Sequence, residues 1–192
     1  MTVIHFITHP EVSIDAAVPV PDWPLSPVGI RRMQVAMTRP WLAGVRSVFC
    51  SAERKAKDAA GIVANHCGLH PIVVEGLGEN DRSATGYLPK REFEAMADAF
   101  FARPDDSIRG WEPAKDAQRR IIDAVERVIA MSAADGDVAI VSHGGVGTLL
   151  LCHLKGVPIS RSEDQPSGGG GNFFSFDTTS RRLLSGWRRI EG

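Results

Sequence analysis

The chain has 192 residues, 43% of them hydrophobic, a composition that suits one domain with a sizeable core and excludes a disordered chain. Its net charge of −1, from 22 Lys and Arg against 23 Asp and Glu, argues against a nucleic-acid partner or an anionic membrane surface. Three cysteines without a C-x-x-C pair predict reduced thiols. The chain shows neither a signal peptide nor an apolar run near the ~18 residues of a membrane span. We therefore expect a cytoplasmic protein with a single domain over residues 1–192.

The first part of the chain alternates short apolar runs with helical patterns. Prolines at positions 19, 21 and 24 predict a loop after the first run, and Ser26 before Pro27 is typical of a helix start. Gly68 is expected to close the second helix. The predicted elements are a strand over Val3–Ile7, a helix from Pro27 to about Met37, a strand over Val45–Cys50, a helix over Glu53–Cys67 and a strand over Pro71–Glu75.

The second part continues this alternation after a long loop over Gly76–Arg91, whose length indicates a functional role. Asp135-Gly136-Asp137 is expected to break the longest helix, and a glycine-rich loop is predicted over Ser167–Gly171. The predicted elements are a helix over Glu92–Phe101, a turn over Pro104–Gly110, helices over Glu112–Ala134 and Val146–Lys155 on either side of a strand over Val138–Val141, and final strands over Phe173–Asp177 and Leu183–Trp187.

Strands that alternate with helices predict an α/β fold, a three-layer sandwich with a largely parallel central sheet flanked by helices. In such sheets, ligands bind beyond the carboxyl ends of the strands. The first strand ends at His9, the second leads to Ser51 and Arg54, and the fourth leads to His143 and a helix start. Backbone N–H groups at a helix start favour an anion, so these residues predict a small anionic pocket.

Four motifs in chain order resemble those of the histidine phosphatase superfamily, the phosphoglycerate mutase-like proteins. That family carries Arg-His-Gly after its first strand, Ser-x-x-Arg after its second, Leu-x-Glu in a loop, and finally Ser-His-Gly-Gly. Pro24-Leu25-Ser26-Pro27-Val28-Gly29 also resembles the family's Pro-Leu-Thr-x-x-Gly helix start. The corresponding segments here are Thr8-His9-Pro10, Ser51-Ala52-Glu53-Arg54, Leu77-Gly78-Glu79 and Ser142-His143-Gly144-Gly145.

The resemblance implies a metal-independent enzyme without a cofactor that acts on a small phosphorylated molecule. His9 would attack phosphorus and form a phosphohistidine, and Arg54 and His143 would hold the phosphoryl oxygens. Glu79 would donate a proton to the leaving oxygen, with Asp81 as the rival donor. The implied phosphate-binding residues are Thr8, His9, Arg54, His143 and Gly144.

The first motif departs from the family, because Thr8 replaces its arginine and Pro10 its glycine. A lost charge-assisted contact costs roughly 1.5–3 kcal/mol, unless Arg82 or Arg109 replaces it. The leading hypothesis is a phosphomonoester hydrolase. The alternatives are a catalytically impaired member that binds a phosphorylated ligand or partner and, less favoured, a phosphomutase. The sequence carries no code for the substrate or the oligomeric state.

Overall fold

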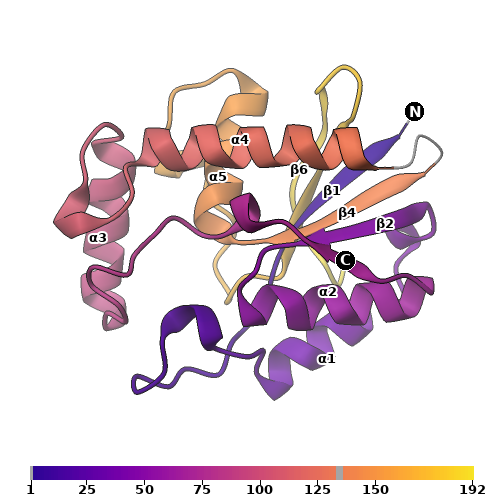
Figure 1. Ribbon diagram of the computed structural model, residues 1–192, viewed down its shortest axis with the longest axis horizontal. Helices are drawn as coiled ribbons and strands as arrows, with labels where there is room; N and C mark the ends of the chain where they lie inside the picture. Colours follow the sequence, from indigo (N-terminus) through magenta and orange to yellow (C-terminus); the bar gives the residue numbers. More distant parts are fainter. Residues whose placement is uncertain (1, 133–135) are drawn as a thin grey trace.

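The computed structural model describes residues 2–132 and 136–192, which form a six-stranded mixed sheet in the order β3-β2-β4-β1-β5-β6 (Figure 1). The first four strands in this order pair in parallel, and the last two join in antiparallel fashion. This arrangement confirms the predicted largely parallel sheet. The strands are β1 Val3–Thr8, β2 Val45–Cys50, β3 Pro71–Val73, β4 Asp137–Ser142, β5 Asn172–Asp177 and β6 Leu183–Arg189.

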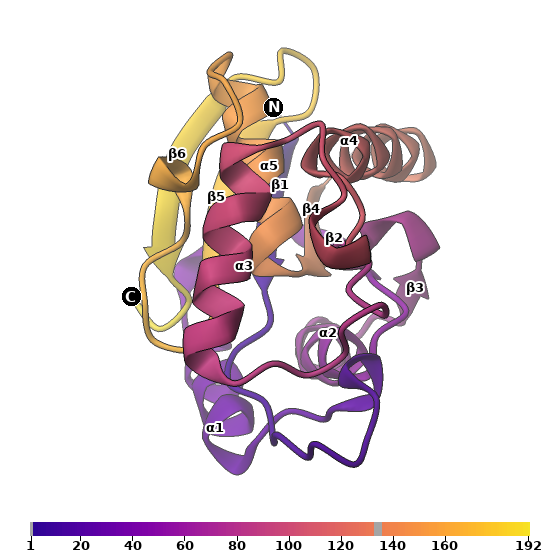
Figure 2. The same cartoon turned by 90° about the vertical axis from the view of Figure 1, so that its left-hand side faces the viewer.

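Helices cover both faces of the sheet, which confirms the predicted three layers (Figure 1). Helices α1 and α2 lie on one face, and α4 and α5 lie on the other. Helix α3 stands at the end of the molecule toward which the parallel strands run, the end that faces the viewer in Figure 2. The helices are α1 Pro27–Ala36, α2 Arg54–Cys67, α3 Lys90–Ala102, α4 Ala114–Met131 and α5 Gly144–Lys155.

The central strand β4 shows how the sequence builds two cores. Successive strand side chains point to opposite faces, so Val138 and Ile140 pack under α4 and α5, whereas Ala139 and Val141 pack under α2. All four side chains are fully buried. A strand that is apolar on both faces is typical of a parallel sheet covered by helices. Within the described residues, no helix is long and apolar enough to cross a membrane.

Several elements end at other residues than predicted. Strand β1 reaches Thr8 and β4 reaches Ser142, because these two residues pair in parallel with each other. The third strand stops at Val73, and a 3₁₀ turn over Glu75–Leu77 follows it. The predicted helix over Glu112–Ala134 is helical from Ala114 to Met131; residues 133 and 134, and Asp135 of the predicted break, lie outside the described residues.

Candidate functional site

The carboxyl ends of β1, β2 and β4 place His9, Ser51 and His143 together at one edge of the sheet. The backbone N–H of His9 donates to the Ser142 carbonyl at 3.1 Å, and that of Ser51 donates to the Val141 carbonyl at 3.1 Å. The rings of His9 and His143 meet edge to face, with centroids 5.1 Å apart and planes at 70°. Residues 134 positions apart in the sequence are thus neighbours, because parallel strands end at the same edge.

The His9 ring is oriented by one hydrogen bond. Its Nδ1 lies 2.9 Å from the carbonyl oxygen of Pro10, an acceptor, so Nδ1 carries the proton of the neutral ring and donates it. Burial, reinforced by the nearby His143, lowers the pKa of His9 from 6.5 to about 3. His9 is therefore neutral at physiological pH, and the lone pair on its Nε2 is free to act as a nucleophile.

The His143 ring is 1% exposed and uses only one of its two nitrogens. Its Nε2 lies 2.7 Å from Ser51 Oγ and 3.3 Å from Glu53 Oε1. Its Nδ1 is buried without a hydrogen-bond partner among the described residues. Burial lowers the pKa of His143 more than the negative charges of Glu53 and Glu79 raise it. The Nδ1 of His143 is thus the nitrogen of this ring without a partner, and it is closed off from solvent.

The cation buried beside the histidines is Lys55, which the sequence interpretation missed. Lys55 is 5% exposed, donates to the Val20 carbonyl at 2.8 Å and forms an ion pair with Glu53. Its positive charge lowers the pKa of both His9 and His143. The predicted Arg54 is exposed and makes no hydrogen bond or ion pair within the described residues.

The phase of α2 explains this placement. Lys55 shares a helix face with Ala59, one turn further on, and Ala59 is fully buried against the sheet. The alternation of exposed and buried positions along α2 therefore turns Lys55 inward and leaves Arg54 outward at the helix start. The inward helix phase was the signal in the sequence that could have identified Lys55.

The carboxylate of Glu79 lies on the first turn of α5, where the sequence predicted a substrate anion. It accepts the backbone N–H groups of Gly145 and Val146 at 3.0 Å each, and it pairs with Arg82 at 3.2 Å. Burial alone would raise the pKa of Glu79, but the charges of Arg82 and His143 and the Gly145 N–H lower it overall. Glu79 is therefore ionised. Because it occupies two backbone donors of α5, only the Gly144 N–H of the predicted helix-start donors is without a partner among the described residues.

The loop that carries Glu79 is anchored from both sides. Arg120 donates to the carbonyl oxygens of Gly76, Gly78 and Glu79 at 2.9 to 3.1 Å. The guanidinium of Arg82 lies over the rings of Phe93 and Trp111, 4.9 and 5.0 Å from their centroids. Glu79 is thus held in place, as a precisely positioned catalytic or binding group requires.

Of the other loop candidates, one reaches the site and two do not. Asp81 is exposed, and its carboxylate accepts the backbone N–H of Ser83 at 2.8 Å. Of the two arginines expected to compensate for Thr8, Arg82 reaches the site through its ion pair with Glu79. Arg109 is exposed in a left-handed turn with φ of 49° and makes no ion pair within the described residues.

Thr8 is 1% exposed and its hydroxyl is engaged in the protein. The hydroxyl donates to Gln165 Oε1 at 2.7 Å and accepts the backbone N–H of Asn172 at 3.1 Å. Pro10, which replaces the family's glycine, still supplies the carbonyl that orients His9. The divergent first motif therefore still supplies the hydrogen bond that orients the His9 ring.

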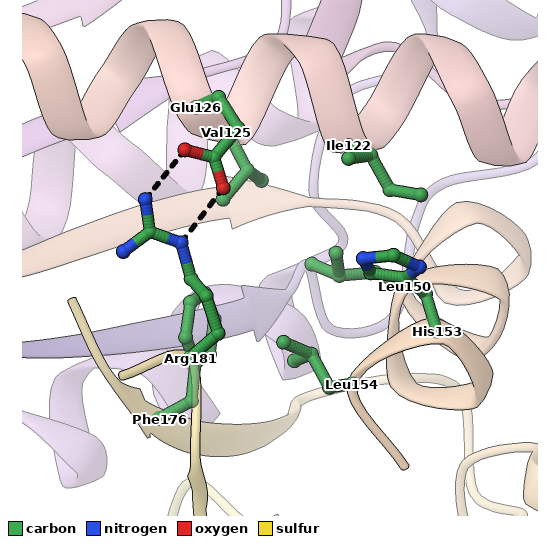
Figure 3. Close-up of a pocket in the computed structure, with 8 residues that line it drawn as sticks. All are labelled: Ile122, Val125, Glu126, Leu150, His153, Leu154, Phe176 and Arg181. Atoms are coloured by element: carbon green, nitrogen blue, oxygen red, sulfur yellow. Dashed lines mark hydrogen bonds and ion pairs between the residues drawn. The ribbon is translucent and has the colours of Figure 1, made fainter. Parts of the chain in front are cut away.

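A hollow elsewhere on the molecule has a different character (Figure 3). It lies between α4, α5 and β5, where a paired Arg181 and Glu126 flank mostly apolar side chains such as Leu150 and Phe176. Phe176 pairs with Ile4 near the start of β1, whereas the two histidines lie at the carboxyl ends of the strands. The hollow between α4, α5 and β5 has a volume of about 20 Å³, which holds roughly one water molecule. Among the described residues, no group of three or more His, Cys, Asp or Glu could hold a metal.

The fold and the paired histidines define the class of protein. The chain belongs to the histidine phosphatase superfamily (branch 1), whose pattern matches residues 4–171. Structurally, it is similar to the protein YhfR of Bacillus stearothermophilus, with 21% identity and a TM-score of 0.78 over 96% of this chain and 95% of that one. A comparison with curated proteins found no match.

Two further solved structures carry a phosphatase name. The mycobacterial glucosyl-3-phosphoglycerate phosphatase is 20% identical, with a TM-score of 0.75 over 98% of this chain and 96% of that one. A putative α-ribazole-5′-P phosphatase from Escherichia coli is 18% identical, with a TM-score of 0.71 over 100% of this chain and 98% of that one. The mycobacterial enzyme also has structures with inorganic phosphate and with vanadate. At these identities the likeness establishes the fold.

Proposed function

We propose that the protein hydrolyses a small phosphomonoester through a phosphohistidine at His9. The observation that carries the proposal is the pair of neutral imidazoles, 5.1 Å apart at the carboxyl ends of β1 and β4. The bond from Nδ1 of His9 to the Pro10 carbonyl leaves Nε2 as the attacking atom. Membership of the superfamily and the phosphatases of similar fold support a phosphatase in general terms.

In the first step, the Nε2 lone pair attacks phosphorus in line and the bond to the leaving oxygen breaks. His143, the Gly144 N–H and Lys55 are the nearby groups suited to the charge on the transferring oxygens. Arg54, free at the start of α2, supplies a guanidinium that can fold over the bound group. In the second step, water attacks phosphorus, the N–P bond breaks, and inorganic phosphate leaves. No metal takes part in this scheme.

Glu79 is the carboxylate we assign to proton transfer. Its ionised state suits the base that takes a proton from the attacking water, and that proton passes to the leaving oxygen of the next turnover. A dianionic phosphoryl group beside Glu79 raises the pKa of the carboxylate, which favours the protonated form that donates to the leaving oxygen in the first step. Glu53, 3.3 Å from His143, is the second carboxylate of the site.

The test uses p-nitrophenyl phosphate and the variant His9→Ala, with His66→Ala as the matched control because His66 is exposed on α2. We expect His9→Ala to lose turnover by a factor on the order of 10⁴ or more, while His66→Ala retains it. Acid-labile, alkali-stable phosphate should be trapped on the wild-type protein and not on His9→Ala. Turnover that survives in His9→Ala would refute the proposal.

A non-catalytic phosphate-binding role is the second candidate. Thr8 in place of an arginine favours it, as does the occupation of two N–H groups at the start of α5 by Glu79. Such a protein would bind inorganic phosphate or vanadate and hydrolyse no phosphomonoester. Calorimetry with inorganic phosphate, run beside the turnover assay, separates the two functions.

A further inference from the structure

The side chain of Gln165 lies between the end of β1 and the start of α5, next to Thr8 of the divergent first motif. Its Oε1 accepts the hydroxyl of Thr8, the residue before His9, at 2.7 Å. Its Nε2 lies over Gly144, where a side-chain carbon would come within 2.2 Å of it. One side chain thus touches the residue before His9 and the residue after His143.

The neighbours of Gln165 determine which end of its amide faces the pocket. The Nδ2 of Asn172 lies 3.0 Å from one end of the amide and 3.5 Å from the carbonyl oxygen of Pro166. A carbonyl oxygen only accepts, so the Asn172 atom that faces it is the donor nitrogen. The Gln165 atom that meets this donor is then the oxygen, and Nε2 points the other way, toward Gly144.

The Thr8 hydroxyl strengthens this orientation. It accepts the backbone N–H of Asn172 at 3.1 Å, and its own hydrogen has two acceptors, Gln165 Oε1 at 2.7 Å and the Asn172 carbonyl oxygen at 3.3 Å, of which Gln165 is the nearer. Oε1 therefore receives two donors, and Nε2 has no hydrogen-bond partner among the described residues. The result is an oriented, unpaired donor beside Gly144, the residue that follows His143.

We propose that Gln165 Nε2 binds an oxygen of the phosphoryl group, and that Thr8 and Asn172 are positioning residues for this amide. The inference rests on the proposed function and adds a ligand-contacting residue to it. A neutral amide donor then contacts Thr8, the position at which the first motif of the family has an arginine. Because the partner oxygen is charged, the contact belongs to the stronger class of hydrogen bonds.

The test measures the affinity for inorganic phosphate and for vanadate by calorimetry, together with hydrolysis of p-nitrophenyl phosphate. Gln165→Leu removes the donor, and Gln165→Glu keeps the acceptor for Thr8 and Asn172 but presents a negative oxygen to the ligand. The matched control is Gln34→Leu on the exposed side of α1. We expect a loss in phosphate affinity of about tenfold to a hundredfold for Gln165→Leu and a larger loss for Gln165→Glu. The control should match the wild type, and thermal unfolding is recorded for each variant so that a loss of affinity is read only from folded protein.

The positioning role has its own readout. Thr8→Val removes the hydroxyl with little change in volume, so it should weaken phosphate binding less than Gln165→Leu does, and Thr8→Ser should restore it. If Gln165→Leu and Gln165→Glu bind phosphate as the wild type does while the control behaves normally, the role of Gln165 is refuted and the proposed function stands. If the wild type neither binds phosphate nor turns over, the proposed function itself falls, and this inference falls with it.

Discussion

The two walls of the candidate site differ in how far their polar groups are already satisfied. The histidine wall, formed by Thr8, His9, His143 and Gln165, ends in nitrogens without a partner in the described structure, namely Nδ1 of His143 and Nε2 of Gln165. The carboxylate wall, formed by Glu53, Glu79 and Arg82, has its charges paired with Lys55, with backbone N–H groups and with one another.

This difference suggests that one wall binds the ligand and that the other holds the loop in place. Buried polar groups are nearly always hydrogen-bonded, so we assign the unpaired nitrogens beside the two histidine strands to ligand binding. Charges that are paired on every side hold the loop in place and shift the pKa values of neighbouring groups. The histidine wall therefore takes the phosphoryl oxygens in our proposal, and the carboxylate wall moves protons. The predictions below probe this division, from the largest expected effect to the smallest.

The largest expected effect comes from a comparison of the variants Glu79→Gln and Asp81→Asn. Glu79→Gln should lower turnover of p-nitrophenyl phosphate by about 10²- to 10³-fold, the range for loss of a general acid–base group. It should leave phosphate affinity within a few fold, because the amide oxygen still accepts one of the two N–H groups of α5 and Arg120 still anchors the loop. Asp81→Asn should change neither quantity, since Asp81 is exposed in a turn. A larger effect of Asp81→Asn would reassign the proton carrier.

Replacement of Thr8 tests whether a larger side chain at position 8 competes with Gln165 for the same space in the histidine wall. The resemblance alone suggests that Thr8→Arg raises activity by restoring a guanidinium. In the structure, Thr8 is buried against Gln165, so we expect Thr8→Arg alone to lower phosphate affinity about tenfold, the order of one lost hydrogen bond to a charged group. The double variant Thr8→Arg with Gln165→Gly opens that space and should bind phosphate at least as tightly as the wild type. Equal losses in the single and double variants would show that Thr8 does not compete with Gln165 for this place.

The smallest effect, counted per pH unit, is on stability against pH. The pKa of His9 is about 3 in the folded protein and about 6.5 in the unfolded chain, so between these values only the unfolded chain takes up this proton. The free energy of unfolding should therefore fall as the pH is lowered from 6.5 toward 3. The fall should be steeper than in His9→Asn, by at most about 1.4 kcal/mol per pH unit. His5, whose pKa is also lowered, lies outside the pair of His9 and His143, is present in both proteins and cancels in the difference. Parallel curves for the two proteins would contradict a neutral, buried His9.

Much of the fold was predictable from local sequence patterns. Apolar runs alternating with helical patterns predicted the sheet and its layers, and the residues that follow the strands predicted the meeting of His9 with His143. Strand ends are readable because a strand in a parallel sheet carries its function at its carboxyl end. The helix-closing role of Gly68 was equally readable, and its φ of 68° is the left-handed conformation that glycine adopts without strain.

The sequence by itself thus determined the family, the layered fold and the two facing imidazoles, because these follow from periodicity and from motifs next to strand ends. Only the tertiary structure decided the remainder of the site. The phase of α2 buried Lys55 in place of Arg54, and the packing of the long loop brought Glu79 to the first turn of α5. Gln165 comes from a loop without periodicity, and its role depends on contacts with Thr8 and Asn172 that chain order does not show. Local patterns govern which way a strand or helix faces, whereas contacts between distant loops form only when the whole chain packs.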